Sequence, residues 1–117
     1  MKKTSFILYG VLLMLLGSCA TTNPPLYTWN NYSVSTYNYV KSKTDADRNA
    51  LIKTYEKIIN KQVGTRKCVP PGVYADYGFL LIQTGQNEKG KEMLTKEIAL
   101  YPESKVFIER LLNNMAQ

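Results

Sequence analysis

Two observations predict an all-α fold of about five helices for residues 31–117. Apolar side chains recur at spacings of three and four residues along most of this range, as on one face of a helix. Glycine and proline, which begin or end helices, separate the periodic segments at Gly64, Pro70, Gly85 and Pro102. Together they indicate short amphipathic helices joined by tight turns.

The first two predicted helices cover residues 31–41 and 45–62. Residues 31–41 are rich in aromatic residues and in Ser, Thr and Asn, so a strand is the alternative to a short helix there. The pattern in residues 45–62 is clearer, because Thr44 or Asp45 can cap the N-terminus and Gly64 follows as a stop.

Three further helices are predicted after this stop. Pro71 opens a helix over residues 71–84, since proline at the first helical position gives up no needed donor. A glycine-containing turn leads into a helix over residues 87–100, and Pro102 ends it. Ser104 can cap the last helix.

The composition argues against an enzyme. The chain carries a net charge of +6 and no His, so the commonest general base and metal ligand at neutral pH is missing. No phosphate loop, nucleophile motif or metal-ligand spacing occurs, and we expect neither a cofactor nor a small-molecule substrate. Cys68 has no cysteine partner in the domain, which leaves burial, a free thiol or pairing with another chain open.

The N-terminus has the layout of a targeting peptide. Lys2 and Lys3 precede residues 6–16, which contain no charge, and Leu16-Gly17-Ser18-Cys19 follows. The uncharged run covers about 16 Å, too little to span a hydrocarbon core of about 30 Å. The last four residues resemble the lipobox of bacterial lipoprotein precursors.

That resemblance implies cleavage between Ser18 and Cys19 and lipid attachment at Cys19. It divides the chain into a signal peptide at residues 1–18, a lipidated tether at 19–30 and a helical domain at 31–117. A helix that stays in the membrane, or a signal peptide cut elsewhere, is the alternative. Ala20, where an Asp often signals inner-membrane retention in such proteins, implies an outer-membrane anchor that faces the periplasm. Export also makes a nucleic-acid partner unexpected.

Residues 71–104 have the proportions of one tetratricopeptide unit, whose period is 34 residues. The residues that match its motif by position are Tyr74, Tyr77, Gly78, Leu81, Gly85, Gly90, Leu94 and Pro102. Glu97 and Asn87 depart from the motif. The resemblance implies stacked helical hairpins, with residues 31–62 as a worn first copy and the helix after Ser104 as a cap.

Beyond this repeat motif, the whole chain after the predicted cleavage site resembles a family of small bacterial lipoproteins of unknown function. The matching blocks are residues 27–32, the Val69-Pro70-Pro71-Gly72-Val73 run with the five residues after it, and residues 100–104. Asn30 stands where that family usually has Gly. Such proteins are typically encoded beside a lipoprotein related to the curli-secretion channel, which implies an accessory role at an outer-membrane secretion assembly.

Two exposed features are candidates for partner binding. Lys53, Lys57 and Lys61 recur at four-residue spacing and would form a basic stripe, although a solvated helix face is the more ordinary interpretation. Aromatic residues crowd the start of the domain, and they either pack the first helix or line a groove: Tyr27, Trp29, Tyr32, Tyr37 and Tyr39. Trp29 and Tyr32 are the strongest interface candidates among them.

The sequence therefore predicts a lipid-anchored adaptor that faces the periplasm and binds a protein of an outer-membrane assembly, such as a curli-channel-type lipoprotein. The alternative is an envelope structural or anionic-lipid-binding lipoprotein that uses its basic residues on headgroups and has no dedicated protein partner.

Overall fold

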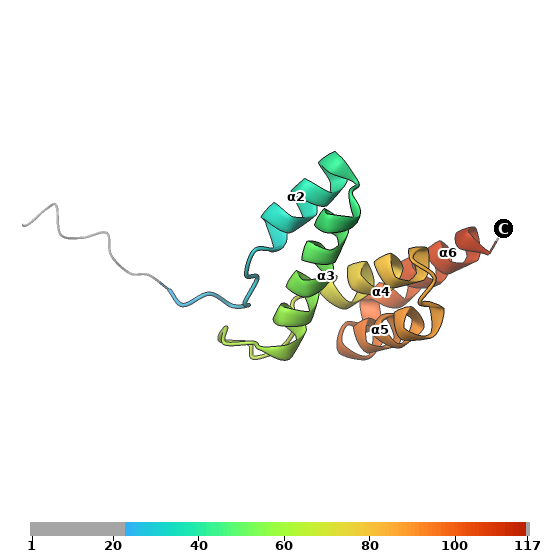
Figure 1. Cartoon of the computed structure of the whole chain (residues 1–117). Helices are drawn as coiled ribbons and strands as arrows, with labels where there is room; N and C mark the ends of the chain where they lie inside the picture. The colour runs from blue at the N-terminus through green and yellow to red at the C-terminus, as the bar shows by residue number, and fades with distance from the viewer. Residues whose placement is uncertain (1–22, 117) are drawn as a thin grey trace, which may run out of the picture.

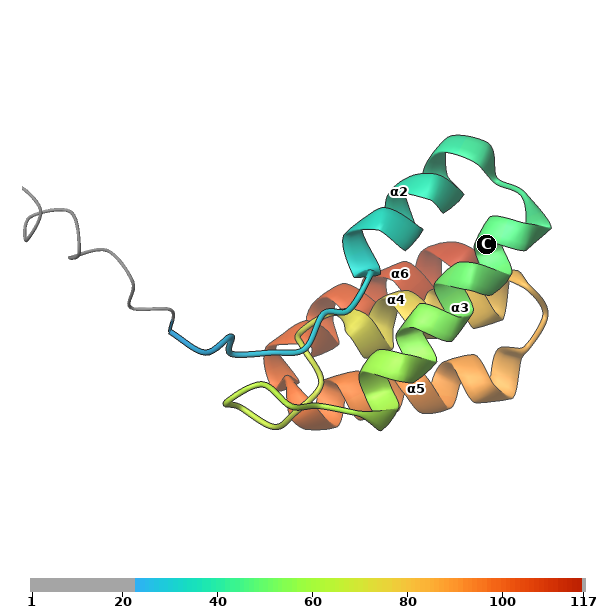
Figure 2. The same ribbon diagram turned by 60° about the vertical axis from the view of Figure 1, so that its left-hand side comes forward.

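The computed structural model describes residues 23–116, and within this range the chain is all-α, as predicted. Its helices stack side by side behind an extended N-terminal segment (Figure 1, Figure 2). Five α-helices and one short 3-10 turn make up the described fold: α2 (Tyr32–Ser42), α3 (Asp45–Asn60), α4 (Val73–Gln83), α5 (Asn87–Leu100), η1 (Pro102–Ser104) and α6 (Lys105–Met115). Ser18, Cys19 and the predicted cleavage site lie outside the described residues.

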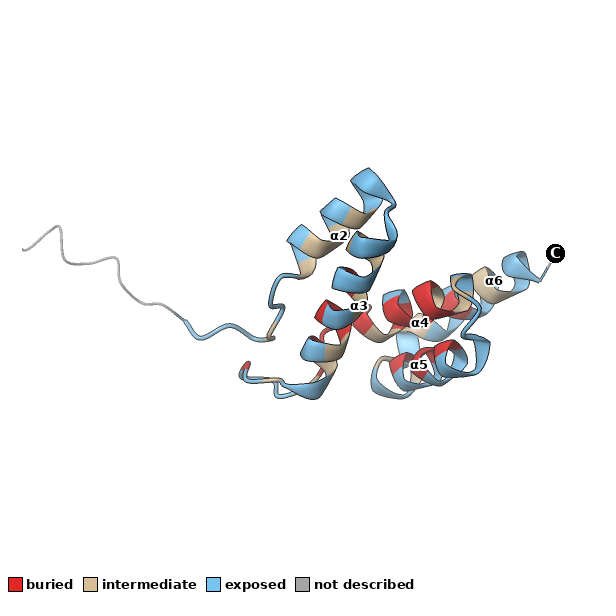
Figure 3. Ribbon diagram, in the orientation of Figure 1, coloured by how far each residue is buried: buried red, intermediate tan, exposed pale blue. Residues whose placement is uncertain are grey.

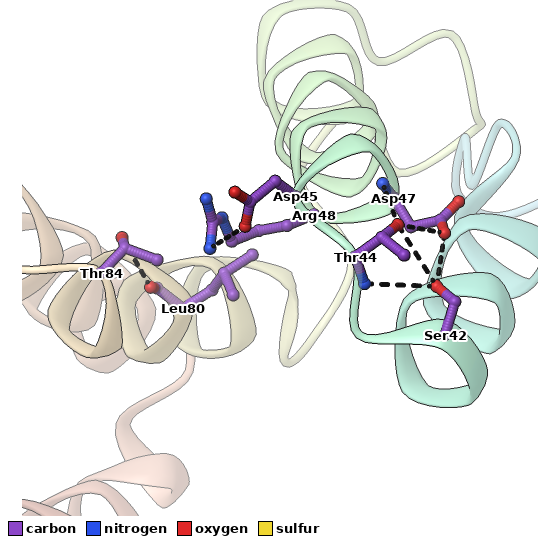
Figure 4. Close-up of polar contacts among 7 residues, drawn as sticks. All are labelled: Ser42, Thr44, Asp45, Asp47, Arg48, Leu80 and Thr84. Carbon is purple, nitrogen blue, oxygen red and sulfur yellow. Dashed lines mark hydrogen bonds and ion pairs between the residues drawn. The ribbon is translucent and has the colours of Figure 1, made fainter.

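Helices α2 and α3 form the first hairpin, and the helical interpretation of residues 31–41 is confirmed over its strand alternative. Lys43 adopts the left-handed conformation that closes α2, with its amide donating to the Tyr39 carbonyl. Thr44 is the N-cap of α3, as predicted, and its hydroxyl accepts a hydrogen bond from the Asp47 amide (Figure 4). The Asp47 carboxylate in turn accepts from the hydroxyls of Ser42 and Thr44.

The start of α4 differs from the prediction, because Pro71 lies before the helix and Gly72 is the N-cap. Gly72 has φ +88°, a conformation that costs glycine little, and the Val73 amide donates to the Pro70 carbonyl. The Glu97 carboxylate of α5 accepts the Gly72 amide at 2.8 Å. From the sequence, Glu97 is only a departure from the repeat motif. In the structure Glu97 is fully buried, and its carboxylate accepts the N-cap amide of α4.

The second hairpin joins α4 to α5 through a very close helix crossing. A Cβ on Gly78 would lie 2.8 Å from the Gly90 carbonyl oxygen, and one on Gly90 would lie 2.7 Å from the Gly78 carbonyl oxygen. Only residues without a side chain allow the two backbones this approach. Gly78 and Gly90 therefore permit the close packing of α4 against α5.

Two clusters of buried apolar side chains hold the hairpins together. The larger joins α3 to α4, and the residues at its centre are Leu51, Tyr55, Ile58, Val73, Tyr77 and Leu81. The smaller joins α4, α5 and α6 through Ala75, Leu94 and Ile108. Helix α6 thus covers the end of the stack, although Ser104 makes no side-chain capping bond to it.

Helix α3 ends at Asn60, two residues before the predicted end, because the chain after it pairs with the N-terminal segment. Gln62 exchanges hydrogen bonds with the backbone of Thr28, and the Thr28 hydroxyl accepts from the Val63 and Gly64 amides. The Arg66 amide donates to the Leu26 carbonyl at 3.0 Å. The last residues of the predicted tether therefore lie against the domain.

Candidate partner-binding groove

A groove of about 240 Å³ lies between α2 and α4. Both helices pack against α3, which supplies the floor through Leu51 and Tyr55. Residues three, four or seven apart share a helix face, so two short sets of side chains form the walls. The α2 wall consists of Thr36, Tyr39 and Val40, and the α4 wall of Asp76, Phe79, Leu80 and Gln83.

One hydrogen bond joins the two helices that carry the walls. The Tyr32 hydroxyl donates to the Asp76 carboxylate at 2.5 Å, across 44 residues of sequence. Burial and this hydrogen bond both raise the pKa of Tyr32 above its ordinary value. Burial also raises the pKa of Tyr55 at the floor, and the nearby Asp76 carboxylate adds to that increase. Both phenols therefore stay neutral at physiological pH and act as hydrogen-bonding and packing groups.

The lining is mostly apolar and includes one polar atom with no partner. The Thr36 hydroxyl is buried and makes no hydrogen bond within the described residues. Val40 is 64% exposed and Gln83 is exposed, so both are accessible from solvent. An apolar cleft with few polar groups is the usual form of a binding site for a small ligand or a partner side chain.

The predicted aromatic residues divide between packing and exposure. A row of rings runs from Tyr27 through Trp29 to Tyr32, then to Tyr55, with centroid separations of 6.3, 5.3 and 6.0 Å. Tyr32 is half-buried in this row, so part of its ring packs between α2 and α3. Trp29 keeps 41% of its surface exposed and stays available for contact.

The other two predicted aromatic residues lie on different faces of α2. Tyr39 lines the groove, as the groove interpretation expected. Tyr37 points outward with 63% exposure, and the Lys41 ammonium lies 5.8 Å from its ring centroid. The lining residues Phe79 and Gln83 were missed. The sequence did contain a signal for Phe79, because a large apolar residue off the main buried face of its helix indicates a second contact surface.

The basic stripe does not contribute to the groove. Lys53, Lys57 and Lys61 are all exposed, and none lines the groove between α2 and α4. Lys61 lies just after α3 in an extended conformation, so it leaves the helical register of the other two. Lys53 and Lys57 keep the helical spacing of the predicted stripe and are open to solvent.

A polar cluster on the other side of the stack joins α3, α4 and α5. The Tyr77 hydroxyl donates to the Glu56 carboxylate at 2.9 Å, and the Lys89 ammonium lies 3.6 Å from the same oxygen and 5.5 Å from the Tyr77 ring centroid. Burial raises the pKa of Tyr77. The neighbouring Tyr77 and then Glu56 raise the pKa of Lys89, which therefore stays charged at neutral pH. These mutual contacts make the cluster a cross-link between helices.

We also searched the described residues for a metal site, a membrane-spanning helix and the surroundings of Cys68. Among residues 23–116 no group of three potential metal ligands comes together, and no helix there has the length and hydropathy to cross a bilayer. Cys68 is half-buried, with its sulfur 3.9 Å from the Tyr101 hydroxyl, which donates to the Val69 carbonyl.

The fold and the groove together define the class: an all-α domain of stacked helical hairpins with an open apolar groove between the first helices of two hairpins. The chain belongs to the family described as "Domain of unknown function (DUF4810)", which it matches over residues 26–111. Comparison with curated proteins and with solved structures finds no match.

Proposed function

We propose that this protein is a lipid-anchored adaptor that faces the periplasm and holds a segment of a partner protein in the groove between α2 and α4. The observation that carries the proposal is the groove itself, which has an apolar floor and accessible walls. Apolar surface left open in this way gains free energy when a partner covers it.

The order of the helices supports a tetratricopeptide-like interpretation of the groove. In that interpretation α2 and α4 are the first helices of successive hairpins, and such helices line the inner face of a solenoid. The tight crossing at Gly78 and Gly90 and the turn at Gly85 fit the same motif. The partner would be a protein of an outer-membrane secretion assembly, such as the curli-channel-type lipoprotein that the family resemblance implies.

A groove of about 240 Å³ has room for a few side chains, so the occupant is a short extended or helical segment. Affinity for a site of this size is modest. A lipid at Cys19 would compensate by confining the adaptor to the membrane that carries its partner, which raises the local concentration of each for the other.

Site-specific photo-cross-linking in intact cells tests where the partner lies. A photoreactive residue in place of Gln83, on the groove wall, should give a discrete adduct with one envelope protein. The same residue in place of Thr95, exposed on α5 and away from the groove, should give none. Placement at Lys57 tests the basic stripe separately. An adduct from Lys57 alone would overturn the groove as the binding site.

A matched pair of charge substitutions sharpens this test. Val40→Asp puts a carboxylate on the groove wall, whereas Val34→Asp makes the same change on α2 outside the groove lining. The two valines are 64% and 62% exposed, so both variants should fold. Val40→Asp should lower the adduct yield at Gln83 about tenfold, or about 1.4 kcal/mol, and Val34→Asp should not. Equal yields would contradict the proposal.

The anchor is tested by Cys19→Ala, which should leave the domain folded and release it from membranes. A variant that still fractionates with membranes after a salt wash would contradict the anchor. A chain that stays on the membrane but gives no adduct from any position would favour the alternative, an envelope lipoprotein without a dedicated protein partner.

A further inference from the structure

A second surface lies at the end of the domain where the N-terminal segment enters. We call it the entry patch: Leu26, Lys61, Val63, Arg66 and Lys67. All five residues are exposed, and Val63 and Leu26 expose 72% and 56% of their surface. Figure 2 shows the loop after α3 projecting beside the segment that leads into α2.

Hydrogen bonds fix the entry patch in place. The Thr65 and Arg66 amides donate to the Pro25 and Leu26 carbonyls, both at 3.0 Å. Gly64 is buried against this segment, and a Cβ there would lie 2.5 Å from the Leu26 carbonyl oxygen. Leu26 and Val63 therefore stay exposed on a backbone that hydrogen bonds already order. Covering them would cost little further conformational entropy.

The charge of the entry patch has one sign. No Asp or Glu occurs in residues 23–44 or in residues 61–75. The ion pairs within the described residues involve other cations, so Lys61, Arg66 and Lys67 are not neutralised by neighbours there. Exposed cations beside exposed apolar side chains are the composition that binds anionic membrane interfaces.

The position in the chain points to the same partner. Six residue steps separate Cys19 from Pro25, which is at most about 20 Å of extended chain. A lipid on Cys19 would therefore hold the entry patch within that distance of the bilayer surface. The opposite end of α3, at Asp45, lies about 24 Å along the helix axis from the end at Asn60 that adjoins the entry patch.

We infer that the entry patch docks on the anionic phospholipid headgroups of the leaflet that holds the anchor, with Leu26 and Val63 entering the interface. This inference rests on the proposed lipid anchor. Docking fixes the orientation of the domain, so that the groove between α2 and α4 is presented at a set height above the membrane.

Each cation near an anionic leaflet contributes about a fivefold preference for the docked state, so three contribute roughly 100-fold. The preference should weaken as salt screens the surface, since the Debye length falls from about 10 Å at 0.1 M to about 3 Å at 1 M. Anchoring by lipid has no such salt dependence, which separates the two contributions.

Depth-dependent fluorescence quenching measures docking directly. Trp29 is the single tryptophan. In the full lipidated chain with Trp29→Phe, Val63→Trp places the only reporter in the entry patch. The chain is reconstituted into vesicles of neutral phosphatidylcholine, or of that lipid with phosphatidylglycerol, each with brominated acyl chains. Quenching is expected in the anionic vesicles and should fall strongly in the neutral ones.

Charge-matched variants test the cations. Replacing Lys61, Arg66 and Lys67 with Gln should abolish quenching in anionic vesicles. Replacing Lys41, Lys43 and Lys53 with Gln removes the same charge farther from the patch and should preserve it. A Val34→Trp reporter on α2 should stay unquenched in every vesicle.

Flotation of the same vesicles separates failure of this inference from failure of the anchor. Chains that float with neutral vesicles but show no anionic-dependent quenching at position 63 would overturn docking and leave the anchor intact. Chains that do not float with neutral vesicles would overturn the anchor. An equal loss of quenching in the two triple variants would show that general charge attraction acts in place of the entry patch. Full quenching in both variants would show that the cations of the entry patch are not needed.

Discussion

The two hairpins bury very different fractions of their first helices. Helix α4 has six buried residues, whereas α2 has none, although the two helices have the same length of 11 residues. Figure 3 shows the same contrast, because the buried positions gather on α3, α4 and α5 while α2 has only intermediate and exposed ones. The helix behind one wall of the groove thus belongs to the core, and the helix behind the other wall is packed on the surface of the core.

This contrast implies that the two helices beside the groove differ in how firmly they are held. Helix α4 provides a fixed wall, since its position is set by the core. Helix α2 is held by half-buried aromatic packing, the Ser35–Thr54 hydroxyl contact at 2.9 Å and the Tyr32–Asp76 hydrogen bond. Elements with few buried apolar contacts open at lower free energy than the core. We therefore expect α2 to move more readily than α4, which would change the width of the groove.

The largest test of the contrast compares one residue type in both helices. Tyr77→Ala should destabilise the domain by about 4 kcal/mol, because it removes a buried ring and leaves a cavity. Tyr37→Ala should cost less than about 0.5 kcal/mol, since that ring is mostly exposed. Tyr77 is 2% exposed and Tyr37 is 63% exposed. Urea denaturation followed by circular dichroism measures both. Similar losses for the two variants would mean that α2 belongs to the core.

The next largest effect concerns the close crossing of α4 and α5. Gly90→Ala places a Cβ 2.5 Å from the Ile82 side chain and 2.7 Å from the Gly78 carbonyl oxygen. We expect a loss of about 2 kcal/mol, because overpacking outweighs the better helix propensity of Ala. Thr95→Ala, at an exposed site on the same helix, is the control and should change stability by less than about 0.5 kcal/mol. A neutral or stabilised Gly90→Ala variant would show that the helices can separate.

Local sequence signals predicted the helices well. Apolar periodicity and the Thr44 cap placed α3, and the glycine-containing turn and Pro102 placed both ends of α5 within a residue or two. The error at Pro71 has a tertiary cause: Glu97 reaches from α5 to accept the Gly72 amide, so the helix begins after the glycine. No local pattern around Pro71 reports a carboxylate 25 residues away.

The candidate site was less accessible to sequence reasoning, because a groove between helices depends on how hairpins stack. Tyr39 was among the aromatic residues considered for a groove, but Phe79 and Gln83 were not. Tyr32 is a predicted interface residue, and in the structure it joins α2 to α4 through a hydrogen bond to Asp76, which the sequence does not indicate. Both outcomes follow from contacts between different helices, which periodicity within one helix cannot report.

The third effect concerns the bond that holds the weaker wall. Tyr32→Phe keeps the ring and removes the hydroxyl that donates to Asp76. We expect a loss of about 1.5 kcal/mol, as for hydrogen bonds to charged groups. Hydrogen exchange should show a larger loss of protection in α2 than in α5. Equal loss in both helices would mean that α2 does not open separately.

The same bond predicts a dependence on alkaline pH. The pKa of Tyr32 is raised above 10.0 in the folded state. Its contribution to stability is therefore complete below pH 10 and is lost as the pH rises towards the folded pKa. Burial raises the pKa of Tyr55 and Tyr77 too, so the whole domain loses stability in this range. Tyr32→Phe should lose less stability between pH 9 and pH 11 than the natural chain, as measured by urea denaturation. An equal slope would contradict the role of Tyr32.

The smallest effect concerns the joint between α2 and α3, where local capping replaces core packing (Figure 4). Thr44→Ala removes the N-cap hydroxyl and should cost about 1 kcal/mol. The hydroxyls of Ser42 and Thr44 also lower the pKa of Asp47, so their contribution is present above the ordinary carboxyl pKa and fades as the pH falls through the lowered value. Thr44→Ser should restore the cap.

The joint also sets how α2 leaves α3, so Thr44→Ala should loosen the groove. The cross-link yield at Gln83 should therefore fall more for Thr44→Ala than for Thr84→Ala, which removes a hydroxyl bonded within α4. If both changes lower the yield equally, the joint does not control the position of α2.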